Sequence, residues 1–290
     1  MAGDCRFREF EALQNLLHCV EAGTMQTLGL DASQLPDFVS ALQGVGPVWA
    51  PVETEPGLFN LQVIDHASHA RPEALRTVIP FKKLLLPPSF AMFEGEFADA
   101  GGPETCCGRI GQGPQVLYGA HACDIHALKI LDLLYLSEYV DPYYAASRDG
   151  LMVVAYGCWP DESCFCESLG TSNVDDGFDV ALTPLDGRFL VTVATPRGDD
   201  FVSAHSPLFT PPNAADIRDY LARLRERKKA FRLQLDVSDL PYVLEMKKDD
   251  PVWDELARRC LCCGSCSIVC PTCSCFNVAD AIGEDGSAAR

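Results

Sequence analysis

The sequence lacks any apolar run long enough to cross a lipid bilayer, which takes about 20 residues. Its longer apolar runs, such as Leu151–Tyr156, are far shorter. The stretch Met1–Arg8 carries charges where a signal peptide has its apolar core, and no small-residue cleavage pattern follows. We therefore expect a cytoplasmic protein without a membrane span.

Positive charge is also scarce. The chain has 23 Lys and Arg against 41 Asp and Glu, so its net charge is −18. An acidic surface repels the phosphate groups of nucleic acids and of anionic lipids. The composition thus argues against a nucleic-acid partner and against binding at a membrane surface.

What the sequence has in excess is cysteine, with 15 among 290 residues. A reducing compartment disfavours disulfides, the count is odd, and the chain is long for a disulfide-stapled scaffold. The proportions of hydrophobic residues (48%) and charged residues (22%) are those of a folded globular protein with a core. The thiols are therefore expected to bind metal, as zinc sites or as iron–sulfur clusters.

Apolar patterning predicts an α/β protein with a small mixed sheet, α+β elements at the N-terminus, and a ferredoxin-like, cysteine-rich helical segment at the C-terminus. In the centre, a strand at 115–119, a helix at 125–139 and a strand at 151–157 form a βαβ unit, which implies a parallel strand pair. We assign residues 1–80 to an N-terminal α+β region, 81–240 to a central α/β domain, and 241–290 to the start of a ferredoxin-type [4Fe–4S] domain. Further predicted elements are helices at 7–20, 36–42, 214–231 and 251–259, strands at 48–52 and 58–64, and a hairpin of 178–182 with 188–194, whereas 65–113 is expected to be irregular.

The C-terminal cysteines follow the bacterial ferredoxin spacing C-x2-C-x2-C-x3-C-P, formed by Cys260, Cys263, Cys266, Cys270 and Pro271. Three thiolates on a tight loop can reach three corners of one cubane, and Gly264 lets the backbone approach the sulfides. Zinc sites typically use a second CxxC pair after a longer loop, and that pair is absent. We predict a [4Fe–4S] cluster here, with zinc or inert thiols as the alternative.

The fourth ligand of this cluster is open. In two-cluster ferredoxins the fourth cysteine of the run binds the other cluster, and this sequence has no second run. Either Cys270 closes the cluster itself, or Cys273 or Cys275 does, or the natural chain continues past Arg290, which we favour. Cys262 is the spare thiol of the run, and we expect it to be packed or weakly exposed.

Four more cysteines lie around the predicted βαβ unit. Parallel strands collect ligand-binding residues at their carboxyl ends, so Cys123 and Cys158 should lie side by side, with the loop of Cys164 and Cys166 folding over them. A helix N-terminus at Cys123 favours a thiolate. We predict a second [4Fe–4S] cluster here, with a structural zinc ion or four unrelated buried thiols as alternatives.

Neighbouring residues receive structural interpretations. His121 and His126 border this site, and we expect both to be hydrogen-bonded scaffold rather than ligands. The basic residues of the helix at 214–231 are expected to form a solvated face, which is also the one place where an acidic partner could dock. Gly108, Gly111 and Gly113 do not form G-x-G-x-x-G after a strand, so flavin or nicotinamide chemistry is assigned to another chain.

Several segments carry a resemblance when they are taken in order. They are Lys82–Pro88, Gly119–Asp124 with Ala127-Leu128, Asp141–Tyr144, Cys158 with Cys164–Cys166, and Cys260–Phe276. Together they resemble the iron–sulfur β subunit of cytoplasmic sulfhydrogenases, which are [NiFe] hydrogenases, and the A subunit of anaerobic sulfite reductase. The chain departs from the family at His121-Ala122, where the family has Arg-Pro, and in lacking a second ferredoxin run.

The resemblance implies a non-catalytic electron-transfer subunit of a multi-subunit oxidoreductase. Such a subunit relays electrons between a flavin-containing subunit, which uses NAD(P)H or ferredoxin, and a hydrogenase or reductase catalytic subunit that carries nickel–iron or sirohaem. It also implies that Cys123, Cys158, Cys164 and Cys166 are cluster ligands. Two alternatives stay open: a zinc-stabilised interaction scaffold on the same cysteines, and a free-standing reductase at the central cysteine site.

Overall fold

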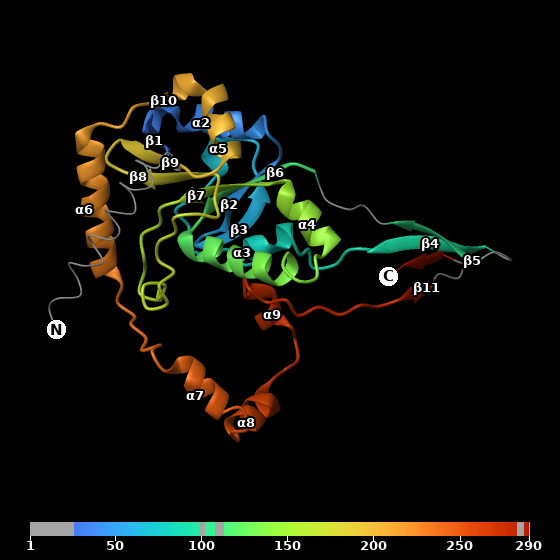
Figure 1. The fold of residues 1–290 in the computed structure, drawn as a ribbon. Coiled ribbons are helices and arrows are strands. Elements are labelled where there is room, and N and C mark those ends of the chain that lie inside the picture. The colour runs from blue at the N-terminus through green and yellow to red at the C-terminus, as the bar shows by residue number, and fades with distance from the viewer. Residues whose placement is uncertain (1–25, 99–101, 108–112, 283–286, 290) are drawn as a thin grey trace.

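We describe a computed structural model of the chain, which defines residues 26–98, 102–107, 113–282 and 287–289. Its centre is an eight-stranded mixed sheet with helices on both faces (Figure 1). The predicted α/β class is confirmed, and the sheet is larger than the small one expected. In sheet order its strands are β10 (Phe209–Thr210), β1 (Gln26–Asp31), β9 (Arg188–Val193), β8 (Val180–Pro184), β7 (Leu151–Tyr156), β6 (Gln115–Ala120), β2 (Val48–Glu55) and β3 (Leu58–Val63).

The middle of the sheet is parallel. β2, β6, β7 and β8 pair in parallel, whereas the outer neighbours pair in antiparallel fashion. The helix α3 (Ala122–Tyr135) connects β6 to β7, so the predicted βαβ unit is confirmed. All six residues of β6 are buried, because helices cover both faces of this part of the sheet. The predicted hairpin is confirmed as β8 and β9.

The two faces of the sheet have separate apolar cores. On one face α2 (Leu35–Gln43) and α5 (Pro196–Ala204) pack on the sheet, and the rings of Phe38 and Phe201 meet edge to face at 5.7 Å between centroids. On the other face α3 and α4 (Pro142–Asp149) pack against strand residues such as Leu117. The apolar positions of β6 and β7 alternate between these cores, which explains why both strands read as continuous apolar runs.

Side-chain caps position two of the helices. The Asp141 carboxylate accepts hydrogen bonds from the backbone N–H groups of Tyr143 and Tyr144, at 2.9 and 2.8 Å, and so starts α4. Asn213 and Asp216 cap each other's backbone N–H groups in a capping box, which starts α6 (Ala214–Ala230). Short 3₁₀ helices complete this part of the chain: η1 (Ala32–Gln34), η2 (Ala67–His69), η3 (Phe81–Leu84) and η4 (Ser206–Leu208).

A second, four-stranded sheet projects from the body, at the right of Figure 1. It contains β4 (Phe93–Ala98), β5 (Gly102–Cys107), β12 (Ser287–Ala289) and β11 (Ala281–Ile282), in the order β11-β12-β4-β5. The expectation that residues 65–113 are irregular is therefore wrong for the β4–β5 hairpin. The pattern of this segment is weak, and part of its pairing comes from β12, whose Ser287 lies opposite Glu96.

After α6 the chain leaves the sheet. The helices α7 (Leu240–Met246) and α8 (Val252–Arg259) lie apart from the body, and α9 (Ser265–Val269) returns beneath α3 (Figure 1). The structure does not establish a ferredoxin fold for this tail, and the division of the chain at residues 80 and 240 stays a prediction. The predicted helix at 7–20 lies outside the described residues. No helix in the described part of the chain combines the length and apolar character that crossing a membrane requires.

Candidate metal centre

Cys123 and Cys158 follow the carboxyl ends of two neighbouring parallel strands. In the register of β6 and β7, Ala120 lies opposite Ala155, and each cysteine comes three residues later. The register shifts at Gly119, whose φ is +96° and whose Cβ, if present, would lie 3.1 Å from Cα of Pro72. This bulge needs glycine, and it aligns the two strand ends from which the cysteines follow.

The first turn of α3 holds Cys123. The helix was expected to start at Ile125 but starts at Ala122, because a capping box forms earlier: the backbone N–H of His121 donates to Oδ2 of Asp124 at 2.9 Å. The expected thiolate at Cys123 is not what the site favours. The thiol of Cys123 hydrogen-bonds to Cys166, and this contact raises the pKa of Cys123.

A turn-rich loop brings Cys164 and Cys166 back over the strand ends. The backbone N–H of Thr171 donates to the carbonyl oxygen of Cys166 at 2.9 Å, and that of Cys164 donates to Asp161 at 3.4 Å. The charges of Cys158 and Cys166 both act on Cys123, so these three thiols lie in one neighbourhood. Cys164 neighbours Cys166 and hydrogen-bonds with Asp161.

The surroundings shift the pKa values of Cys166 and Cys164 in opposite directions. The hydrogen bond from Cys123 and the charge of Arg227 lower the pKa of Cys166 to about 6. Burial and the neighbouring Asp161 raise the pKa of Cys164 to about 11. The site therefore favours a thiolate at Cys166 more than at Cys123 or Cys164.

Arg227 is the residue of this site that the sequence interpretation missed. It was counted in the solvated basic face of α6, but it is only 8% exposed and its guanidinium lies against Cys158. A usable signal was present: Arg227 continues the helical spacing of Ile217, Tyr220, Leu224 and Phe231, which is the apolar side of this helix. An arginine on the apolar side of a helix is expected to face the protein interior rather than solvent.

The two histidines make hydrogen bonds to backbone carbonyl oxygens, as predicted. His121 is buried, and its Nε2 lies 2.9 Å from the oxygen of Pro72. His126 Nε2 lies 2.8 Å from the oxygen of Asn173, in the loop that follows the cysteines. Both rings therefore fix the backbone around the site.

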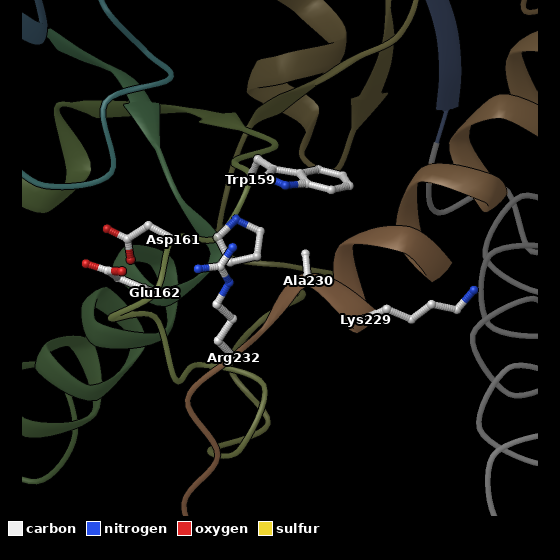
Figure 2. A pocket seen from close by; sticks show the side chains of 7 residues that line it. Trp159, Asp161, Glu162, Lys229, Ala230 and Arg232 are labelled. Atoms are coloured by element: carbon white, nitrogen blue, oxygen red, sulfur yellow. The ribbon is translucent and has the colours of Figure 1, made fainter.

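An open pocket of about 500 Å³ lies beside the cysteine loop, with residues 159–162 forming one wall and the end of α6 the other (Figure 2). Figure 2 shows Arg232 reaching toward the loop, whereas Lys229 points away from it. The guanidinium of Arg223 stacks over the exposed ring of Trp159, 5.2 Å from its centroid. This pocket is an open approach to the loop that joins Cys158 to Cys164.

The tail cysteines surround α9. Gly264 caps this helix with φ of +72°, a left-handed conformation that suits glycine, and Cys262 before it has φ of 53°. Cys260, Cys262, Cys263, Cys266 and Cys275 are exposed, whereas Cys270 and Cys273 are half-buried.

Cys273 and Cys275, the two alternatives for the fourth ligand, meet each other in the structure. Hydrogen bonds from the backbone and the side chain of Cys275 lower the pKa of Cys273, and the same side-chain contact raises that of Cys275. The charge of Cys266 also acts on Cys275. The fold therefore brings both alternatives into the neighbourhood of the ferredoxin run.

The donor chemistry of both groups is sulfur alone. Within the ranges that the structure describes, no three His, Cys, Asp or Glu side chains come close enough to hold one metal ion. Four thiolates around a zinc ion, each at about 2.3 Å, would have to lie within about 4 Å of one another. A cubane holds its thiolates farther apart, because a different iron binds each one. An all-cysteine donor set is the one that [4Fe–4S] clusters use, so the residues of both groups fit such a cluster by their chemistry.

Comparison with known proteins bears on the whole chain. No family model matches the sequence. The chain is 36% identical over 256 residues to "Sulfhydrogenase 2 subunit beta" of Pyrococcus furiosus, an alignment that covers 88% of this chain and 75% of that protein.

Proposed function

This chain belongs to the family of sulfhydrogenase beta subunits, and we propose that it is an iron–sulfur electron-transfer subunit of a multi-subunit oxidoreductase. In this proposal it relays electrons between a flavin-containing subunit, linked to NAD(P)H or ferredoxin, and a hydrogenase or reductase catalytic subunit. It holds one [4Fe–4S] cluster at Cys123, Cys158, Cys164 and Cys166, and another at the tail run of Cys260, Cys263, Cys266 and Cys270, with Cys273 and Cys275 as alternative fourth ligands. Bound clusters would supply reversible one-electron transfer.

The observation that supports the proposal is that Cys123, Cys158 and Cys166 lie in one neighbourhood at the carboxyl edge of the parallel strands. These thiols come from a helix, a strand end and a loop, and their charges act on one another. Unrelated core thiols have no reason to converge on the carboxyl edge of a parallel sheet, where ligands bind. The absence of a nucleotide motif supports a relay that depends on partner subunits.

The helix α3 runs from the central group toward the tail group. Cys123 lies in the first turn of this helix. At its other end, burial and the charges of Asp141, Cys273 and Cys275 raise the pKa of Tyr135. Twelve residues of helix span about 18 Å. The central group and the tail group therefore lie near opposite ends of one helix, which suits two carriers that act in sequence.

Exposed thiols support a reducing compartment, and we expect the protein to work in the cytoplasm. Each of the eleven cysteines whose side chains the structure describes is free of disulfides, and six of them are exposed. Exposed, reduced thiols persist where the cell keeps them reduced.

One observation favours a second candidate. The direct contact between Cys123 and Cys166 would also suit a dithiol that closes to a disulfide, giving up two electrons and two protons to an oxidised partner carrier. This candidate corresponds to a reductase at the central cysteines, and it predicts no iron there.

Anaerobic purification of the full chain, followed by metal analysis and redox spectroscopy, tests the proposal. We expect a brown protein with about eight irons per chain, whose broad visible absorption bleaches on dithionite. A colourless protein that holds only zinc would overturn it. Iron at the tail alone, with two thiols lost on mild oxidation, would instead support the dithiol.

A further inference from the structure

The guanidinium of Arg227 hydrogen-bonds to the segments that carry the central cysteines. Its Nε donates to the carbonyl oxygen of Cys158 at 2.9 Å, and its Nη2 lies 3.3 Å from Sγ of the same residue. Its Nη1 donates to the oxygen of Ser172 at 2.8 Å and to Oδ1 of Asn173 at 3.2 Å. One side chain thus joins the end of β7 to the loop that follows Cys166.

Arg227 places a cation in a buried position. Among the described residues, no Asp or Glu forms an ion pair with this guanidinium, whereas the next residue, Lys228, pairs with Glu167 at 3.4 Å. A buried cation is costly unless an anion or a full set of hydrogen bonds offsets it, and arginine does not lose its proton in proteins. The sulfur that Nη2 faces is the group near it that can supply negative charge.

A second arginine of α6 contacts the same segment. Arg223, one turn earlier, donates to the carbonyl oxygen of Gly157 at 3.3 Å. α6 therefore fixes the segment before and at Cys158 with two arginines. A lysine in place of Arg227 would keep the charge but not the planar fork.

We infer that Arg227 is a positioning residue that holds the sulfur of Cys158 and raises the reduction potential of the central iron–sulfur site. This inference rests on the cluster proposed above. Reduction adds one negative charge to the site, and a fixed cation beside a ligand sulfur stabilises the reduced form more than the oxidised form. Hydrogen bonds to cluster sulfurs act in the same direction.

The test compares Arg227→Gln, Arg227→Lys and Arg225→Gln in the full chain, purified anaerobically with its iron. Arg225 is exposed on the same helix, so its substitution removes the same charge without touching the site. Each protein is titrated with a redox buffer while the central cluster's electron paramagnetic resonance signal is followed. That signal is identified as the one that Cys123→Ser removes.

We expect Arg227→Gln to keep its iron and to shift the central signal to a more negative potential. At the wild-type midpoint its ratio of reduced to oxidised cluster should fall about tenfold or more, the effect of losing one hydrogen bond to a charged group. The tail signal should not move, Arg227→Lys should shift less, and Arg225→Gln should match the wild type.

Two outcomes would overturn the inference. One is an unchanged central midpoint in Arg227→Gln with full iron, which leaves the proposed function standing. The other is loss of central iron in Arg227→Lys as complete as in Arg227→Gln, because then the fork acts as scaffold and the charge is irrelevant. A wild-type protein without central iron contradicts the proposed function itself, so the two failures are distinguishable.

Discussion

The ammonium nitrogen of Lys82 lies 3.2 Å from the carbonyl oxygen of Cys273, which is 191 residues later in the chain. The same ammonium also donates to the carbonyl oxygen of Ser267 in α9. α9 has only five residues, so its carbonyl groups have few partners within the helix. Lys82, itself 9% exposed, therefore ties the tail cysteines to the body of the protein.

We predict that Lys82→Met weakens the docking of the tail. Hydrogen bonds to a charged group contribute about 1.5–3 kcal/mol, so amide exchange over residues 265–275 should accelerate at least about tenfold. Lys83→Met is the matched control, because the Lys83 ammonium donates to the oxygen of Leu61 at 2.6 Å and lies over Trp49. Equal protection of 265–275 in the two variants would contradict the role of Lys82.

For the central ligands, we predict that Cys123→Ser and Cys164→Ser each lower the iron content by about four atoms per chain. The spectroscopic signal of the tail cluster should remain in both. Iron and acid-labile sulfide analysis of anaerobically purified protein measures this. If both variants keep the wild-type iron content, there is no central cluster at these residues.

Within the tail, we predict that Cys262→Ser keeps the wild-type iron content, whereas Cys263→Ser loses the tail cluster. Cys262 does not fit the C-x2-C-x2-C spacing, and its backbone is left-handed, unlike that of its neighbour. The two substitutions change adjacent, exposed thiols in the same way. Loss of iron in Cys262→Ser would make Cys262 a ligand and the predicted spacing wrong.

A stability prediction concerns Asp179, which is buried before β8. Its carboxylate accepts hydrogen bonds from the backbone N–H of Val153 at 2.7 Å and from the hydroxyl of Thr195 at 2.6 Å. Asp179→Ala leaves this buried N–H without its partner, which costs about 1–3 kcal/mol. Urea unfolding of the full chain should show this loss, and the exposed Asp186→Ala should not. An unchanged unfolding midpoint in Asp179→Ala contradicts the prediction.

Local patterning predicted most of the main sheet. Strands β6 and β7 are buried on both faces, so their apolar runs are continuous and easy to recognise. The β4–β5 hairpin was missed, since its sequence has no clear alternation and β12, far along the chain, supplies part of its pairing. The start of α3 was set late because the capping box of His121 and Asp124 is not the usual Ser or Thr pattern.

The sequence by itself predicts the chemistry of the tail, because the spacing of Cys260, Cys263 and Cys266 lies within one short loop and needs no distant partner. It also determined that Cys123 and Cys158 follow parallel strands. Only the tertiary structure decided that Cys166 contacts Cys123, that Arg227 turns inward against Cys158, and that Lys82 holds the tail. Each of these contacts joins segments far apart in the chain, and their meeting depends on how loops and helices pack on the sheet rather than on local spacing.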